Sequence, residues 1–108
     1  MKDTATLLMT TVDSGDLART VATRLLEKRL AACVQEIRIS SLYRWNGELR
    51  CEPEILLLVK TSTEASAAAM RLIEDIHSYD VPEIMALPVT AGLSAYLKWV
   101  AEEADGAA

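Results

Sequence analysis

The sequence has few aromatic residues and few of the residue types that most often carry chemistry. Phenylalanine is absent, and three tyrosines, two tryptophans and one histidine supply all the aromatic rings. The two cysteines, Cys33 and Cys51, form no CxxC pair and are too few for a disulfide framework. Leucine, isoleucine, valine, alanine and methionine must therefore fill the core.

The chain also lacks a basic stripe and a long apolar segment. Its 11 basic residues are scattered among 16 acidic ones, and the formal net charge is -5. Nucleic acid and anionic membranes are therefore not expected as partners. The apolar run at residues 55–59 is among the longest and is far too short to span a bilayer. The first residues do not resemble a signal peptide, so we expect a cytoplasmic protein.

What is present suffices for one folded domain. The composition is 51% hydrophobic and 25% charged, which is not that of a disordered chain. A chain of 108 residues can bury a core without disulfide or metal staples. We expect a single domain that covers residues 1–108.

The first half of the chain has the pattern of a strand, a helix and a hairpin. Residues 4–12 suit a strand, and Asp13 is predicted to cap a helix whose apolar positions recur from Leu17 to Leu30. Residues 32–45 and 48–61 are then predicted as two strands. Asn-Gly between them favours a type I′ turn, which needs positive φ at both central residues.

The second half repeats the helix–strand order and adds one helix. Thr61 and Glu64 resemble a capping box before a second helix. Its predicted apolar stripe consists of Ala65, Ala68, Ala69, Leu72, Ile73 and Ile76. Residues 83–89 suit a strand, and residues 94–104 suit an amphipathic helix. The order predicts an α+β, ferredoxin-like βαββαβ domain with an extra C-terminal helix.

The predicted hairpin is too long for a domain of this size. Each arm has some 13 residues, or about 43 Å at ~3.3 Å per residue, whereas ordinary strands reach about 20 Å. Its tip is expected to leave the sheet, unless a bulge near Pro53 folds it back. Alternation places Tyr43 and Trp45 on one face, which suggests that they dock on a neighbouring subunit. The alternative is that Trp45 packs across the hairpin onto Leu49 or another neighbour.

Several motifs, in the same order, resemble those of the CutA family, the divalent-cation tolerance proteins. They are Leu30-Ala31-Ala32-Cys33-Val34, Ser41-x-Tyr43-x-Trp45-x-Gly47, Glu54-x-x-x-x-x-Lys60-Thr61, His77-x-Tyr79-x-Val81-Pro82-Glu83-Ile84, Ala86-Leu87-Pro88-Val89, Gly92 and Tyr96-Leu97-x-Trp99. The resemblance covers about residues 5–103. It implies a ferredoxin-like fold, a homotrimer with strands shared between subunits, and a cytoplasmic protein linked to copper and other divalent cations.

The resemblance also directs attention to possible metal ligands. Some members implicated in copper binding have a cysteine in strand one and a His-His pair, and the matching positions here are Met9 and Ile76-His77. Copper(I) accepts sulfur and imidazole ligands, so His77, Met9 and Cys33 are candidate ligands of a copper ion. The alternatives are a core methionine, a buried inert cysteine, and a histidine that complements the dipole of a helix.

A polar cleft between subunits is the other candidate site. Glu54, Lys60, Tyr79 and Glu83 are candidates for lining it, or for pairing with one another. The sequence has a single histidine and lacks both a nucleophile elbow and a glycine-rich phosphate loop. We therefore do not expect an enzyme.

Two alternatives to a metal-binding protein remain open. One is a regulatory trimer of the PII type, which would bind a nucleotide or small anion in inter-subunit clefts and for which Lys60, Arg44 and Arg38 could approach the phosphates. The other is a stable trimer that serves as a scaffold.

Overall fold

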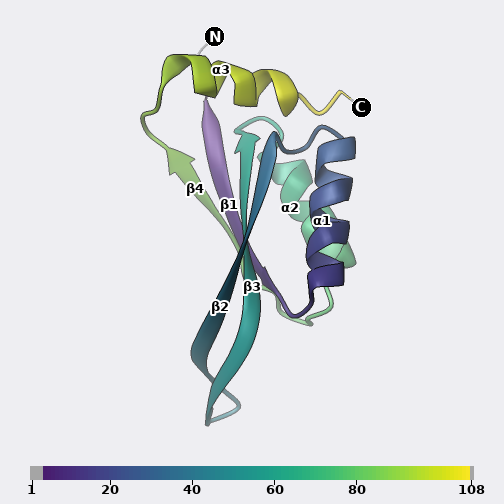
Figure 1. Cartoon of the computed structure of the whole chain (residues 1–108), viewed down its shortest axis with the longest axis vertical. Coiled ribbons are helices and arrows are strands. Elements are labelled where there is room, and N and C mark those ends of the chain that lie inside the picture. The colour runs from purple at the N-terminus through teal and green to yellow at the C-terminus, as the bar shows by residue number, and fades with distance from the viewer. Residues whose placement is uncertain (1–3, 108) are drawn as a thin grey trace.

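Four strands form one antiparallel sheet in the order β2-β3-β1-β4 in the computed structural model, which describes residues 4–107. The elements are β1 (Ala5–Val12), α1 (Gly15–Glu27), β2 (Cys33–Trp45), β3 (Glu48–Ser62), α2 (Ser66–Ile76), β4 (Ile84–Val89) and α3 (Ser94–Glu103). Helices α1 and α2 lie on one side of the sheet, and α3 lies across one end of it (Figure 1). The predicted ferredoxin-like plan with an extra C-terminal helix is confirmed.

The start of α1 differs from the prediction by one residue. Ser14, not Asp13, is the capping residue, because its Oγ accepts a hydrogen bond from the backbone N–H of Leu17 at 3.1 Å. The backbone of Ser14 is extended and the helix begins at Gly15, so only Ser14 is placed to reach the free amides. Asp13 instead accepts a hydrogen bond from the Ser78 hydroxyl at 3.4 Å.

The end of α1 comes earlier than Leu30, in a Schellman motif. The N–H of Leu30 donates to the Leu25 carbonyl at 2.8 Å, and the N–H of Arg29 donates to the Leu26 carbonyl at 3.1 Å. Arg29 occupies the left-handed position, with φ 56°, that glycine usually takes. Its side chain donates to Asp105 at 2.7 Å, which joins the end of α1 to the segment after α3.

The predicted capping box before α2 is wrong. β3 continues to Ser62, so Thr61 is still a strand residue and its hydroxyl donates to the Leu30 carbonyl at 2.7 Å. Ala65 is the N-cap residue of α2 and makes no side-chain capping hydrogen bond. Ser62 instead holds the turn before the helix: its Oγ accepts from the N–H of Ala65 at 3.1 Å and donates to the Ala104 carbonyl at 2.6 Å. One buried hydroxyl thereby ties together the ends of β3, α2 and α3.

The hairpin leaves the sheet as predicted (Figure 1). β1 pairs with β3 only as far as Val12 opposite Ile55, whereas the pairing of β2 with β3 continues without a bulge to Trp45 opposite Glu48. Residues 39–54 therefore form a two-stranded ribbon, and the molecule measures 47 × 27 × 20 Å. Pro53 lies beyond the end of β1, where no third strand needs an N–H from it. The turn has the positive φ values expected, 50° at Asn46 and 79° at Gly47.

The two faces of the sheet differ in what covers them. Leu8, Val12, Leu57 and Val59 point toward α1 and α2 and are buried in the core. Alternation and strand register then place their neighbours on the opposite face, which α1 and α2 do not cover. We call this the open sheet face; it carries Leu7, Met9, Ile37, Ile39, Leu56, Leu58, Met85, Leu87 and Val89.

Candidate functional site

A cleft of about 660 Å³ lies between the projecting ribbon and the loop that connects α2 to β4. The ribbon contributes Tyr43, Trp45, Arg50 and Glu54, and the loop contributes Tyr79, Asp80, Val81 and Glu83. The ribbon residues come from positions that alternate along β2 and β3, so their side chains share one face. The loop reaches the same face by crossing the end of β1 at Thr11, which also lines the cleft.

His77 holds this loop in place. Its Nδ1 accepts a hydrogen bond from the backbone N–H of Tyr79 at 3.2 Å, so the ring proton of the neutral side chain is on Nε2. Nε2 then donates to the carbonyl oxygen of Thr11 at 2.8 Å. Both ring nitrogens are therefore occupied by the protein itself. A metal ion could bind His77 only after one of these hydrogen bonds had broken.

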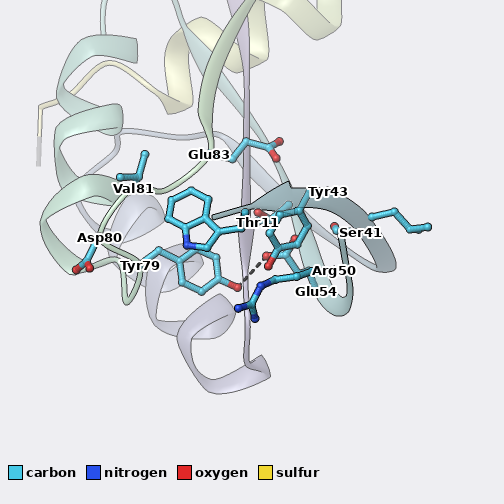
Figure 2. Close-up of a pocket in the computed structure, with 11 residues that line it drawn as sticks. Thr11, Ser41, Tyr43, Arg50, Glu54, Tyr79, Asp80, Val81 and Glu83 are labelled. Carbon is cyan, nitrogen blue, oxygen red and sulfur yellow. Dashed lines mark hydrogen bonds between the residues drawn. The ribbon is translucent and has the colours of Figure 1, made fainter. Parts of the chain in front are cut away.

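Tyr79 and Glu54 join the two walls of the cleft. The Tyr79 hydroxyl donates to Glu54 Oε2 at 2.8 Å, and Figure 2 shows the phenol extending toward that carboxylate. The Tyr79 ring also lies against the His77 ring, with 4.9 Å between centroids. Burial, followed by the hydrogen bond to Glu54 and its negative charge, raises the pKa of Tyr79 well above its usual range. Tyr79 therefore remains a neutral hydrogen-bond donor at any physiological pH.

Tyr43 and Trp45 line the cleft of their own chain and remain 39% and 47% exposed. The Tyr43 hydroxyl donates to Glu52 at 3.3 Å, and burial together with Glu52 raises the pKa of Tyr43. The pairing of β2 with β3 does not place Trp45 next to Leu49, which was one of the alternatives considered above. Trp45 is opposite Glu48, whereas Leu49 is opposite Arg44 on the other face and is 80% exposed.

The three candidate metal ligands do not meet within one chain. Met9 and Cys33 both lie on the open sheet face, but β3 lies between their strands. Two strand spacings and an offset of two residues separate their Cα atoms by about 12 Å. Two sulfur ligands of one ion are separated by less than about 5 Å. His77 lies at the far end of β1 with both nitrogens engaged. Among residues 4–107, no three His, Cys, Asp or Glu side chains gather in a way that could hold a metal ion.

Lys60 is not among the residues that line this cleft of a single chain, and its expected place in a cleft between subunits stays a prediction. It lies opposite Leu7 and Cys33 on the open sheet face, and its Nζ is 5.8 Å from the centroid of the Tyr96 ring. Tyr96 in turn packs on Trp99, with ring centroids 5.6 Å apart. Glu54, Tyr79 and Glu83 do share the cleft. Sequence reasoning missed six of the lining residues: Thr11, Ser41, Leu42, Arg50, Asp80 and Val81. The alternation that placed Tyr43 and Trp45 together could have found Ser41, and also Arg50, which pairs with Tyr43.

Comparison with known proteins gives consistent matches over nearly the whole chain. Residues 6–103 match the family model described as CutA1 divalent ion tolerance protein. The divalent-cation tolerance protein CutA of Thermus thermophilus is 45% identical over 97 residues, which is 89% of this chain and 94% of that protein. Human protein CutA is 38% identical over 91 residues; the match covers 83% of this chain and about half, 51%, of the human protein.

Solved structures agree with these sequence matches. The structure described as the periplasmic divalent cation tolerance protein CutA from Archaeoglobus fulgidus superposes with a TM-score of 0.89 at 36% identity, covering 93% of this chain and 98% of that one. The Thermus thermophilus structure gives 0.87 at 44% identity, with 92% and 97% covered. Within residues 4–107, none of the helices is both long and apolar enough to cross a membrane.

Proposed function

Because the chain belongs to the CutA1 divalent ion tolerance family, we propose that it is a homotrimer that binds divalent metal ions, copper among them. The names of its relatives support the link to divalent cations. The proposed assembly rests on one observation: the open sheet face exposes many apolar side chains to water in the single chain.

The open sheet face has the character of an interface. Ile37, Met85, Leu87 and Val89 are all at least 38% exposed on it. Tyr96 and Trp99 on α3 add two exposed rings, and Tyr96 is joined to this face through Lys60. Soluble monomers rarely expose a contiguous apolar surface of this kind. We propose that equivalent faces of three chains bury it, with each ribbon, including Tyr43 and Trp45, reaching a neighbouring subunit.

The trimer also bears on metal binding. Met9 and Cys33 are too far apart to share an ion within one chain, yet both lie on the face that we propose to be buried between subunits. Assembly could therefore bring sulfur atoms of different chains together, and thioether and thiolate are ligands that copper(I) accepts. The proposed copper site thus requires the trimer. The net charge of -5 favours cations over anions near the surface.

We further propose that the protein acts by binding rather than by catalysis, and that it works in the cytoplasm. Its two cysteines are free thiols, a state that a reducing compartment maintains. Detection of the protein in a fractionated cell, with periplasmic or secreted marker proteins as reference, would test the location.

Native mass spectrometry of Ile37→Asp and Leu26→Asp tests the assembly. Ile37 is 44% exposed on the open sheet face, and Leu26 is 43% exposed on α1, so the two changes place the same charge at equal exposure. We expect a trimer for the unaltered chain and for Leu26→Asp, and dissociation to monomers for Ile37→Asp. A monomeric unaltered chain, or a trimer for both variants, would contradict the proposed interface.

Titration of the same trimer with Cu(I), Cu(II) or ATP tests the ligand. We expect stoichiometric uptake of copper that is reduced in Met9→Leu and Cys33→Ser. Copper uptake that neither variant affects would remove these two residues from the proposal. Saturable ATP binding without copper uptake would instead favour the nucleotide-binding alternative.

A further inference from the structure

Helix α3 is held against the rest of the chain by little apolar burial. Among its ten residues, all within the described part of the chain, only Val100 is fully buried, and Leu97 and Ala101 are half-buried. Tyr96 and Trp99 are 40% and 42% exposed. Burial of one large apolar side chain offsets the conformational entropy of ordering only about two residues. Apolar burial alone is thus a weak basis for the position of α3.

The segment that follows α3 is bound by Arg29, which lies just after α1. Its Nε donates to Asp105 Oδ1 at 2.7 Å and its Nη2 to Oδ2 at 3.4 Å, so two nitrogens of the guanidinium bind one carboxylate. Nη2 also donates to the carbonyl oxygen of Glu102. The backbone contributes as well, because the N–H of Gly106 donates to the Arg29 carbonyl at 2.8 Å. We call Arg29 together with residues 102–106 the clasp.

The surroundings of the clasp hold it in this geometry. Arg29 has φ 56°, a left-handed conformation that persists in a residue with a Cβ only where the structure around it fixes it. The hydrogen bond from Arg29, followed by that from the N–H of Ala107 at 3.0 Å, lowers the pKa of Asp105, so the carboxylate stays ionised at neutral pH. On the inner side, Ser62 donates to the carbonyl of the fully buried Ala104 at 2.6 Å. The end of α3 is thus held by both α1 and β3.

The beginning of α3 has weaker attachments over the described residues. Leu93, which precedes the helix, is 75% exposed, and its side chain makes no capping hydrogen bond. Tyr96 is approached only by the Lys60 ammonium, at 5.8 Å from the ring centroid, which is a weak contact at this exposure. Figure 1 shows α3 lying across one end of the sheet with its last turn near the end of α1. The clasp therefore fixes one end of α3, and the rings of Tyr96 and Trp99 lie toward the other.

We propose that the clasp positions α3 so that Tyr96 and Trp99 take part in the contact between subunits, and that assembly therefore depends on Arg29. The proposal rests on the homotrimer proposed above. Arg29 follows α1, which covers the side of the sheet opposite the open sheet face, so it is a positioning residue that acts through α3. A helix that is already fixed in the free chain costs less entropy to order when chains associate.

The expected effect on assembly is larger than the effect on one chain. An ion pair as exposed as this one, 37% and 45% for its two side chains, shifts a local equilibrium by only about threefold. If loss of the clasp lowers the fraction of chains with α3 in place by that factor, each of the three chains contributes it once. The dissociation constant of the trimer should then rise about 30-fold.

Arg29→Gln and Asp105→Asn test the clasp, and Arg19→Gln is the matched control. Arg29→Gln keeps a Cβ, so the backbone strain is unchanged. Arg19 makes a similar contact, from its Nε to Glu36 Oε2 at 2.8 Å, but that contact joins α1 to β2 and does not involve α3. Analytical ultracentrifugation over a dilution series should show the 30-fold change for the two clasp variants and less than about twofold for Arg19→Gln. Equal changes in all three variants, or none in the clasp variants, would overturn the proposal.

Hydrogen exchange measures α3 separately from the interface. The same substitutions are made in full chains that also carry Ile37→Asp, the change expected to give monomers. We expect amides of residues 94–103 to exchange about threefold faster in the clasp variants, with α1 and α2 unaffected. Faster exchange without a weaker trimer would show that assembly does not need α3 in place, and would overturn this proposal while the homotrimer stands. A monomeric unaltered chain would contradict the homotrimer itself.

Discussion

Thr10 and Thr61 are both fully buried and point to the same face of the sheet, but only Thr61 has a partner for its hydroxyl. Thr61 donates to the Leu30 carbonyl at 2.7 Å, whereas the Thr10 Oγ1 has no hydrogen-bond partner. An unpaired buried hydroxyl costs about 1–3 kcal/mol.

Thr10→Val should therefore stabilise the protein, since valine keeps the shape of threonine and removes the unpaired group. We expect the free energy of unfolding to rise by about 1 kcal/mol in urea titrations. Thr61→Val is the matched control and should lower it by about 1–3 kcal/mol, because the Leu30 carbonyl then loses its donor. Equal effects of the two substitutions would contradict this account.

Arg29 should tolerate glycine better than alanine. Its φ of 56° strains any residue with a Cβ, so Arg29→Ala retains the strain and loses the contact with Asp105. Arg29→Gly loses the same contact but relieves the strain, which is about 1 kcal/mol. The midpoint of thermal unfolding should be higher for Arg29→Gly than for Arg29→Ala, although glycine is the poorer helix former. The reverse order would show that the left-handed conformation is not maintained in solution.

The stability of the protein should decrease at alkaline pH because of Tyr79. Its pKa is raised in the folded state, whereas that of an unfolded tyrosine is about 10. The contribution of Tyr79 is thus fully present below pH ~10 and is lost as the pH rises toward the folded-state pKa. Tyr79→Phe should be less stable at neutral pH and should lose less stability between pH ~9 and ~11, in urea titrations at each pH. Parallel pH profiles for the two proteins would contradict the shift.

His77→Ala should reduce stability but not copper uptake. The imidazole makes two hydrogen bonds that fix the loop before β4, and their loss should cost about 2 kcal/mol in urea titrations. Because neither nitrogen is free, native mass spectrometry should find the same copper stoichiometry as in the unaltered chain. Loss of copper from a variant that remains folded and trimeric would make His77 a ligand after all.

Patterns between near neighbours in the sequence predicted most of the fold. The Asn46-Gly47 pair, the spacing of apolar residues and the length of the strands were enough for the order of elements and the projecting ribbon. The errors concern the residues at which helices begin and end. Asp13 and Ser14 can both cap a helix, and the choice depends on backbone angles that the sequence does not reveal.

The site was harder to predict because it depends on contacts between distant segments. Lys60 and Glu54 lie on the same strand and the same face. The α2–β4 loop nevertheless contacts Glu54, through the Tyr79 hydroxyl, whereas Lys60 lies near the Tyr96 ring of α3. The role of His77 depends on the carbonyl of Thr11, which is 66 positions away in the sequence. A lone histidine in a sequence gives no sign that both of its nitrogens will be occupied.

The ribbon has a consequence for the time course of folding. Its strand pairs begin at a two-residue turn and extend outward, so each pair closes only a short additional loop, and hairpins of this kind form within about 1–10 μs. The pairs that β1 makes with β3 and β4 join segments far apart in the chain and must come later. During synthesis the aromatic side of the ribbon is thus formed before β4 and α3 leave the ribosome. Nascent chains would offer Tyr43 and Trp45 to one another, or to a chaperone, before they are complete.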